Sequence, residues 1–252
     1  MDNFKKTGRP LRELSLCTGA GGGLLGSEIL GFQTVCAVEI EPYCAGVLCE
    51  RQNEGSLPLF PIWDNLKTFD GRPWRGHADL ITAGFPCQDI SSANNLRVGL
   101  NGEKSSLFYE VHRIVCEVEP GWVFLENSPL LTRLGLDTVL QYMAQAGYDA
   151  EWGVLAASAV GASHQRERFW GLFRRQTSDP HSKRLFLQRR TIFQKKTRSW
   201  IRCSLWRENE SRLGRVDNGV AHWMDRLKAI GNGQVPTCMA EAFLQLTRRF
   251  LA

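Results

Sequence analysis

The chain has 252 residues, of which 43% are hydrophobic and 23% charged, a composition typical of a globular protein rather than a disordered one. No apolar run approaches the ~20 residues of a membrane span, and the first ten residues lack the apolar core of a secretory signal. Eight cysteines without a CxxC pair argue against a disulfide scaffold or a zinc ribbon. We therefore expect a cytoplasmic protein with reduced thiols, no metal and no membrane contact.

Positive charge is concentrated in one segment. The whole chain carries +5, but residues 174–215 contain thirteen Lys or Arg and only three acids, so this block is +10 and the remaining residues sum to −5. Aromatic residues are interleaved with the basic ones. This asymmetry favours a polyanionic partner such as nucleic acid, although a solvated loop without a partner would give the same composition.

Strand and helix patterns alternate along most of the chain. Short apolar or β-branched runs predict strands over residues 11–16, 34–40, 79–83, 122–125 and 168–173. Helical periodicity predicts helices over residues 24–30, 42–52, 107–118, 136–146, 223–230 and 236–250. The alternation predicts an α/β fold with a doubly wound, mostly parallel sheet. The rhythm stops between residues 174 and 218, which predicts a small irregular basic module inserted between residues 1–173 and 219–252.

A glycine-rich segment follows the first predicted strand. Residues 18–23 read TGAGGG and precede a helix, so backbone N–H groups can approach an anionic ligand there. Glu39 ends the second predicted strand, where a carboxylate commonly accepts hydrogen bonds from ribose hydroxyls. No GK[ST] follows, which excludes a P-loop. These residues predict a nucleoside cofactor and leave NAD and S-adenosylmethionine open; a purely structural role for Glu39 at the following helix is the alternative.

Reactive side chains follow three later strands. Cys87, in GFPCQDIS, lies in a loop stiffened by Pro86 and is a candidate nucleophile, with an inert buried thiol as the alternative. Glu126, in FLENSP, is a candidate general acid if burial raises its pKa. Arg166 and Arg168 share one face of a strand, so that one of them can orient the Glu126 carboxylate.

Order and combination make these motifs specific. The segments CTGAGGG, AVEIE, GFPCQDIS, FLENSP, QRERFW and GNGQVP follow one another along the chain. In this order they resemble the DNA cytosine-5 methyltransferase family of bacterial or phage type. The resemblance covers residues 14–173 and 215–250, which is most of the chain. It implies a sheet of the S-adenosylmethionine-dependent methyltransferase type and places the protein in the cytoplasm of a bacterial or phage-infected cell.

The resemblance implies a covalent mechanism. Cys87 corresponds to the cysteine that attacks C6 of cytosine, and Glu126 to the acid that contacts N3 and the amino group. Arg168 corresponds to the arginine that holds the cytosine O2 and the acid, with Arg166 beside it in the catalytic set. The base is expected to leave the duplex and enter the pocket. Covalent addition makes the ring carbon C5 a better nucleophile, which agrees with the chemistry of the residues.

The resemblance also implies binding sites for S-adenosyl-L-methionine, with S-adenosyl-L-homocysteine as product. The glycine-rich loop and Asn232 would bind the methionine end, Glu39 the ribose, and the DNL stretch the adenine. The expected cofactor-binding residues are Cys17, Thr18, Gly19, Ala20, Gly21, Gly22, Glu39, Ile40, Asp64, Asn65, Leu66, Gly84, Pro86, Asn232 and Gln234.

Double-stranded DNA is the expected partner, bound by a protein that we take to be a monomer. Residues 91–106 resemble the loop that closes over DNA, and residues 174–213 the target-recognition module. The expected DNA-binding residues are Gln88, Ser91, Arg97, Lys104, Lys195, Lys196 and Arg198.

Four features depart from the family pattern. Cys17 stands where many members have a phenylalanine, and Asn65 where an aspartate usually receives the adenine amino group. His164 replaces the first glutamine of the QxRxR motif, and the recognition module is unusually short. Cys17 is expected to weaken cofactor binding, whereas the amide oxygen of Asn65 can still accept a hydrogen bond and Asp64 is adjacent. None of the departures removes Cys87 or Glu126.

Other functions compete with this interpretation. A tRNA cytosine-5 methyltransferase of the same fold is the second candidate, because the basic block can bind either nucleic acid and phosphate contacts carry no sequence information. A catalytically silent DNA-binding protein is disfavoured because Cys87, Glu126 and Arg168 occur together. A nicotinamide oxidoreductase would leave that set of residues unexplained.

Overall fold

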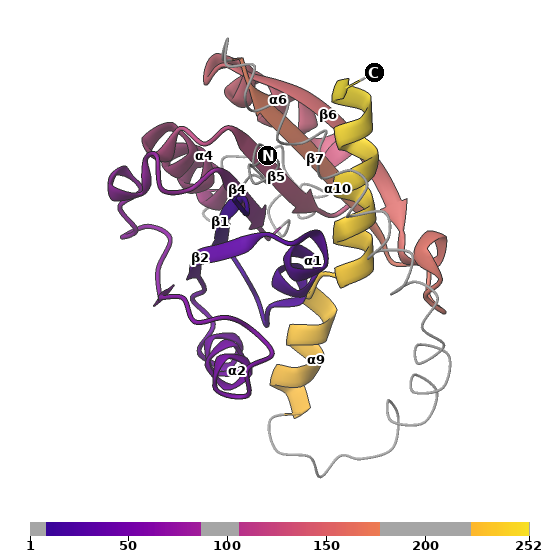
Figure 1. The fold of residues 1–252 in the computed structure, drawn as a ribbon. Helices are drawn as coiled ribbons and strands as arrows, with labels where there is room; N and C mark the ends of the chain where they lie inside the picture. Colours follow the sequence, from indigo (N-terminus) through magenta and orange to yellow (C-terminus); the bar gives the residue numbers. More distant parts are fainter. Residues whose placement is uncertain (1–8, 87–105, 177–222, 252) are drawn as a thin grey trace, which may run out of the picture.

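A computed structural model describes residues 9–86, 106–176 and 223–251. A seven-stranded sheet with the order β3-β2-β1-β4-β5-β7-β6 runs through it (Figure 1). The strands are β1 (Arg12–Leu16), β2 (Gln33–Val38), β3 (Ile62–Trp63), β4 (Leu80–Gly84), β5 (Trp122–Asn127), β6 (Tyr148–Ala156) and β7 (Glu167–Arg175). The first five pair in parallel, whereas β7 is antiparallel to both β5 and β6.

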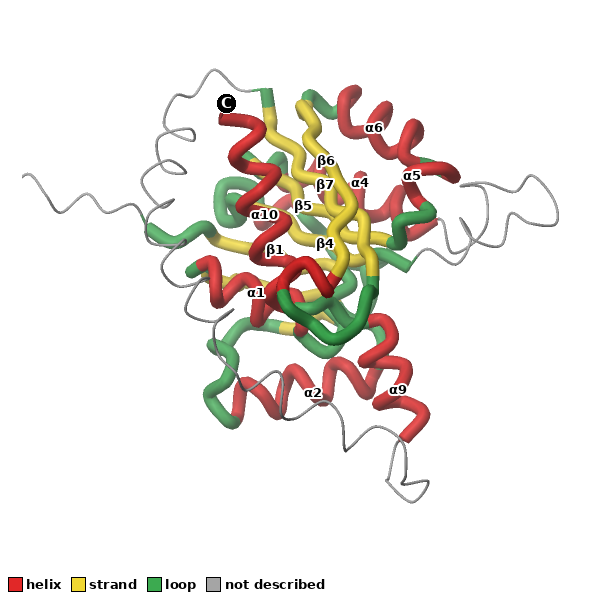
Figure 2. The backbone as a smooth tube through the Cα atoms, turned by 90° about the vertical axis from the view of Figure 1, so that its right-hand side faces the viewer, coloured by secondary structure: helices red, strands yellow, loops and turns green. Residues whose placement is uncertain are grey.

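Helices cover both faces of this sheet (Figure 2). They are α1 (Gly22–Leu30), α2 (Pro42–Asn53), α4 (Ser106–Val118), α5 (Leu131–Leu134), α6 (Leu136–Gln145), α9 (Trp223–Asn232) and α10 (Pro236–Leu251), with short 3₁₀ turns η1 (Arg72–Trp74) and η4 (Ala157–Val160). The hydrophobic core has a layer on each side, because alternate residues of a strand point to opposite faces. Leu14 and Leu16 pack with Val111 of α4, whereas Phe124 and Trp170 pack with Phe243 of α10.

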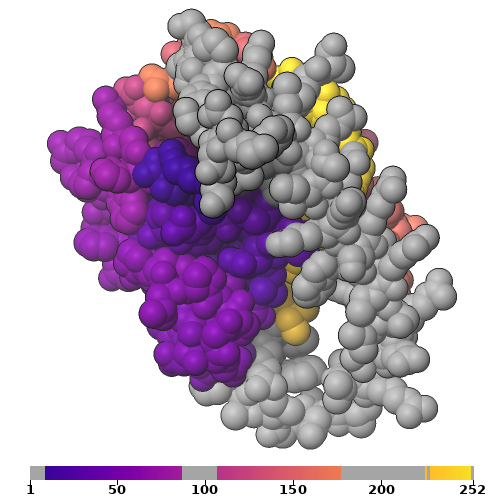
Figure 3. Space-filling view, viewed as in Figure 1, coloured from indigo at the N-terminus to yellow at the C-terminus, as the bar shows by residue number. Residues whose placement is uncertain are grey.

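Local sequence explains how several elements begin and end. Gly31 adopts φ 71° after α1, a left-handed conformation that glycine takes at low cost, so it closes the helix as expected. Pro42 occupies the first turn of α2, where its missing N–H leaves no bond unmade. In the space-filling view, the residues before position 87 form one continuous surface, and residues of α9 border on it (Figure 3). An ion pair of 2.7 Å between Lys228 of α9 and Glu41 joins the two parts.

The predicted α/β fold is confirmed, with additions on both sheet edges. Strands β3 and β6 were not predicted. β6 is an edge strand whose residues are mostly half-buried, so its sequence YDAEWGVLA lacks a clean apolar alternation. No helix in the described ranges is long and apolar enough to cross a bilayer. Most of the predicted basic module, including residues 177–218, lies outside the described residues.

Candidate functional site

The predicted site residues meet because of the direction of the strands. The carboxyl ends of β2, β4 and β5 lie at one edge of the sheet, and strand order reverses there between β1 and β4. Because β7 runs antiparallel, its first residues reach the same edge. Glu126, near the end of β5, is directly opposite Trp170, so Arg168 lies within reach of its carboxylate.

Glu126 is a buried acid held by two side chains. Its side chain is only 9% exposed, and Arg168 Nε lies 3.0 Å from Oε1. Gln234 Nε2 approaches the other oxygen, Oε2, at 3.4 Å. Burial raises the pKa of Glu126 to about 7, against the opposing effects of Arg168, the Gln234 hydrogen bond and Arg166. A carboxyl group with this pKa can hold or release a proton near neutral pH, which suits a general acid.

The two arginines of the RER segment have different partners. Arg168 contacts Glu126, whereas Arg166 donates from one Nη to the carbonyl oxygens of Gly231 and Gly233, at 2.6 Å each. Arg166 therefore fastens the GNGQVP turn between α9 and α10. The same turn carries Gln234, so both arginines act around the Glu126 carboxylate, one directly and one through the turn.

Asn127 connects the end of β5 to the loop that leads toward Cys87. The residue is only 2% exposed, and its side-chain Nδ2 donates to the carbonyl oxygen of Phe85 at 3.0 Å. Its Oδ1 accepts from the N–H of Ser128 at 2.7 Å. The sequence-based prediction gives Asn127 no role, although an amide at the end of a buried strand is a visible signal of one.

Several predicted residues lie outside the described ranges. They are Cys87, Gln88, Ser91, Arg97, Lys104, Lys195, Lys196 and Arg198. The residues before Cys87 are described: Gly84 is half-buried at the end of β4, and Pro86 is exposed. The chain thus leaves the described region next to Glu126.

Glu39 fastens the glycine-rich loop. Its Oε2 accepts from the N–H of Gly19 at 2.6 Å, and its Oε1 from the N–H of Glu41 at 2.8 Å. Burial raises the pKa of Glu39, and these backbone hydrogen bonds oppose the rise. Each oxygen keeps a further lone pair, so the carboxylate can also accept from a ligand hydroxyl.

The glycine-rich loop needs its glycines for two reasons. Gly19 has φ 61° and Gly21 φ 86°, left-handed conformations that favour glycine. A Cβ on Gly19 would meet open space, whereas one on Gly21 would lie 2.8 Å from a methyl group of Leu48. Cys17 also has a positive φ, 52°, and burial raises the pKa of its thiol to about 12, so it is neutral. The open side of Gly19 leaves room for a ligand beside backbone N–H groups.

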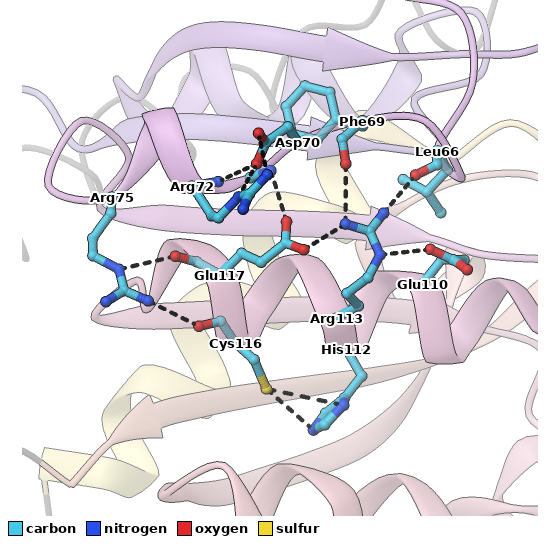
Figure 4. Close-up of polar contacts among 11 residues, drawn as sticks. Leu66, Phe69, Asp70, Arg72, Arg75, Glu110, His112, Arg113, Cys116 and Glu117 are labelled. Atoms are coloured by element: carbon cyan, nitrogen blue, oxygen red, sulfur yellow. Dashed lines mark hydrogen bonds and ion pairs between the residues drawn. The ribbon is translucent and has the colours of Figure 1, made fainter.

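The DNL stretch is pinned to α4 by Arg113 (Figure 4). Arg113 donates to the carbonyl oxygens of Leu66 and Phe69, at 3.0 Å each, and forms ion pairs with Glu110 and Glu117. Glu117 in turn accepts from the N–H of Gly71 at 2.7 Å. Sequence reasoning missed Arg113, although its acidic neighbours at three and four residues' spacing were a visible signal of a helix-surface network.

Side chains beside this loop present a mixed surface to solvent. Asn65 is half-buried and its Oδ1 accepts from the N–H of Lys67 at 2.9 Å, while Asp64 is exposed and Leu66 buried. Ile40 is 68% exposed and Trp63 46% exposed. An apolar side chain and an aromatic ring next to an amide fit the flat face and polar edge of a purine.

One small cavity lies between the glycine-rich segment and Glu126. It is lined by Cys17, Thr18 and Gly23 of the glycine-rich segment and by Gly84, Glu126 and Gln234, together with residues of the sheet and Met239. Glu39, Ile40, Trp63 and Asn65 lie outside this lining. The residues fit the parts of S-adenosylmethionine separately: the open side of Gly19 suits the amino-acid end, the Glu39 carboxylate suits ribose hydroxyls, and the Asn65 amide suits the polar edge of adenine.

Comparison with known proteins adds independent information. A family model described as C-5 cytosine-specific DNA methylase matches residues 11–224. Type II methyltransferase M.CviJI of Paramecium bursaria Chlorella virus IL3A is 34% identical over 171 residues, which cover 67% of this chain and 44% of that protein. Type II methyltransferase M.NgoMIV of Neisseria gonorrhoeae is 32% identical over 62% of this chain and 49% of that protein. The chain thus spans less than half the length of these two relatives.

Solved structures match at the level of the fold. The Dnmt2 methyltransferase of S. pombe gives a TM-score of 0.54 with 20% identity, covering 68% of this chain and 51% of that one. A DNA modification methyltransferase encoded within a prophage of E. coli gives 0.52 with 22% identity, covering 66% and 47%.

Proposed function

Because the chain belongs to the C-5 cytosine-specific DNA methylase family, we propose that it transfers a methyl group from S-adenosylmethionine to C5 of cytosine in DNA. The observation that carries the proposal is the buried Glu126 carboxyl group, held by Arg168 at the edge where the segment toward Cys87 begins. A proton-holding acid beside a nucleophile-bearing loop is the arrangement that covalent activation of a pyrimidine requires.

The family resemblance implies a role for each of these residues, and the chemistry of the side chains suits those roles. Cys87 adds its sulfur to C6, and the electron pair of the C5–C6 double bond moves toward C5 and the N3 side of the ring. Glu126 donates a proton or hydrogen bond at N3, which neutralises the charge that addition creates. Arg168 holds the acid and O2 of the base. S-adenosylmethionine, when bound, supplies the methyl group; loss of the C5 proton and cleavage of the S–C6 bond then restore the aromatic ring and free Cys87.

Other residues are assigned to binding. Glu39 accepts from ribose hydroxyls, Asn65 from the adenine amino group, and the glycine-rich loop with Asn232 takes the methionine end. Residues 1–173 and 219–252 form the catalytic domain, and residues 174–218 the module that binds double-stranded DNA through its basic residues.

Methyl transfer from labelled cofactor tests the proposal directly. We expect incorporation into duplex DNA and not into tRNA, and a denaturation-resistant adduct with DNA that contains 5-fluorocytosine, because fluorine at C5 blocks the loss that frees Cys87. The Cys87→Ser variant should form no adduct and still bind cofactor. Incorporation into tRNA alone would replace the proposal by an RNA methyltransferase.

The basic module has a separate test. Neutralising Lys195, Lys196 and Arg198 together should weaken DNA binding and flatten its dependence on salt, because fewer counterions are released. An unchanged slope would show that these side chains do not touch phosphate.

A further inference from the structure

Gln234 occupies an unusual position between the two parts of the site. Its side-chain Nε2 lies 3.4 Å from Oε2 of Glu126, while Arg168 holds Oε1 of the same group. The residue lines the cavity together with Gly23 and Gly84. Its amide therefore lies where the glycine-rich segment, the end of β4 and the acid come together, at the α9–α10 junction that Figure 1 shows next to α1.

Three glycines leave space for this residue. A Cβ on Gly23 would lie 2.4 Å from Oε1 of Gln234, and one on Gly84 would lie 2.7 Å from its Nε2 and 3.1 Å from Oε2 of Glu126. A Cβ on Gly22 would instead lie 2.2 Å from the main-chain oxygen of Gln234. The side chain is thus fitted against α1 and β4, and its main chain against the first residue of α1.

The main chain of the turn is fixed from the other side. Arg166 donates to the carbonyl oxygens of Gly231 and Gly233, the residue directly before Gln234. Since backbone and side chain are both constrained, the amide is directed at Glu126 by the fold rather than by chance rotation.

We propose that Gln234 is a positioning residue for Glu126. Gln234 and Arg168 contact the two carboxyl oxygens from opposite sides, and Gln234 thereby influences how readily the group holds a proton. The inference rests on the proposed function and extends it, because sequence reasoning assigned Gln234 to the cofactor alone. An N–H donor stabilises the ionised form of a carboxyl group, so Gln234 limits the proton affinity that burial gives to Glu126.

The ionisable groups around this acid make the direction of the effect clear. Arg166 and Arg168 approach it from the β7 side, and both lower the pKa of Glu126. Burial raises the pKa of the Cys17 thiol, in the cavity wall, to about 12 and that of Cys238 on α10 to about 11, so both stay neutral between pH 5 and pH 9. Loss of the Gln234 donor should then raise the pKa of Glu126.

Gln234→Met tests the inference, because methionine keeps the length and volume of the side chain and removes the donor. The first readout is the Glu126 carboxyl band in infrared difference spectra of glutamate-labelled protein, with Glu126→Gln as the subtraction that assigns the band. We expect the titration midpoint to rise by about half a pH unit or more, a modest share of a hydrogen bond's effect. The second readout is adduct formation with 5-fluorocytosine DNA, whose falling alkaline limb should move to higher pH by the same amount.

Gly23→Ala is a second test, because it leaves the amide group of Gln234 itself unchanged. The added methyl group displaces the flexible end of Gln234, so the variant should reproduce the upward shift, and Gly23→Ala combined with Gln234→Ala should match Gln234→Ala alone. Gly22→Ala is the matched control: its clash is with the main chain, so Gln234→Ala should not relieve its effect on stability.

The outcomes separate the inference from the proposed function. An unshifted infrared midpoint in Gln234→Met overturns the inference, whatever the activity. Weaker binding of S-adenosylhomocysteine with an unshifted midpoint also overturns it, and returns Gln234 to the cofactor site. If the infrared midpoint shifts in Gln234→Met but the wild-type protein forms no adduct, the positioning role of Gln234 is supported and the methyltransferase function is contradicted.

Discussion

The two ends of the candidate site are built in different ways. At the proposed cofactor end, Glu39 and Asn65 accept from backbone N–H groups, and Arg113 holds the DNL loop through carbonyl oxygens. At the acid end, Glu126 is held by the side chains of Arg168 and Gln234. The cofactor end therefore depends on loop shape, whereas the acid end depends on the identity of particular side chains.

Departures from the family's pattern occur at both ends. Cys17 and Asn65 lie at the proposed cofactor end, where Glu39 and Arg113 fix the loop geometry, and His164 stands two residues before Arg166. Glu126, Arg168 and Asn127 match the family motifs. A substitution at the acid end removes an interaction that no backbone group can replace.

The largest expected effect is that of Glu126→Gln. Removal of the proton donor should lower turnover by about 10²- to 10⁴-fold, the usual contribution of general acid catalysis, and leave S-adenosylhomocysteine binding unchanged. In the wild type, the pKa of about 7 means that the protonated fraction falls as pH rises through 7, so adduct formation should decline there. Rates measured from pH 5 to 9 check both points; equal loss of cofactor binding would mean that the two ends are not separate.

Glu39→Gln should affect the other end. The amide can accept at one position but presents an N–H toward Gly19 or Glu41, so the loop loses one of two hydrogen bonds. Cofactor affinity should fall about tenfold, equivalent to about 1.4 kcal/mol. Calorimetric titration with S-adenosylhomocysteine measures this, and the pH at which adduct formation declines should be that of the wild type under saturating cofactor. A shift in the pH at which adduct formation declines would contradict the separation of the two ends of the site.

Arg113→Lys should have a smaller effect in the same direction. One ammonium group cannot reach the carbonyls of Leu66 and Phe69 together with Glu110 and Glu117, so the DNL loop loses part of its support. We expect cofactor affinity to fall roughly three- to tenfold, corresponding to one lost hydrogen bond. Arg75→Lys is the control, because Arg75 binds the carbonyls of Cys116 and Glu117 and not the DNL residues. Equal losses in both variants would assign the effect to general destabilisation.

The smallest expected effect is that of Glu13→Gln, in neither end of the site. Glu13 is fully buried and accepts from the hydroxyls of Ser27, Thr34 and Thr82. Burial raises its pKa, so its stabilising contribution is complete below the unfolded pKa near 4.5 and is lost as pH rises through the folded value. The variant should therefore be more stable than the wild type at pH 8 by on the order of 1 kcal/mol and gain less at pH 5. Urea unfolding at both values tests this; a larger gain at pH 5 would contradict it.

Sequence patterns predicted most elements that border the site, including the helix end at Gly31 and the start of α2 at Pro42. They also placed Glu39 and Glu126 at strand ends. Arg113 and Asn127 were missed because their roles depend on partners distant in the chain, Leu66 and Phe85. Strand β6 was missed because its mostly half-buried residues give no clean apolar alternation, although its partner β7 follows it closely in the chain. The catalytic assignment of Cys87 stays a prediction, since that residue lies outside the described ranges.

Motifs and periodicity are local properties, so the chain's own residues already indicate the family, the alternation of strands and helices, and the carboxylates and arginines at strand ends. Folding was needed to reveal that β7 runs antiparallel beside β5, that Arg168 contacts Glu126 while Arg166 binds the turn, and that Gln234 reaches the acid. Strand direction and side-chain pairing depend on residues 42 to 108 positions apart, which meet only when the sheet and its covering helices pack together.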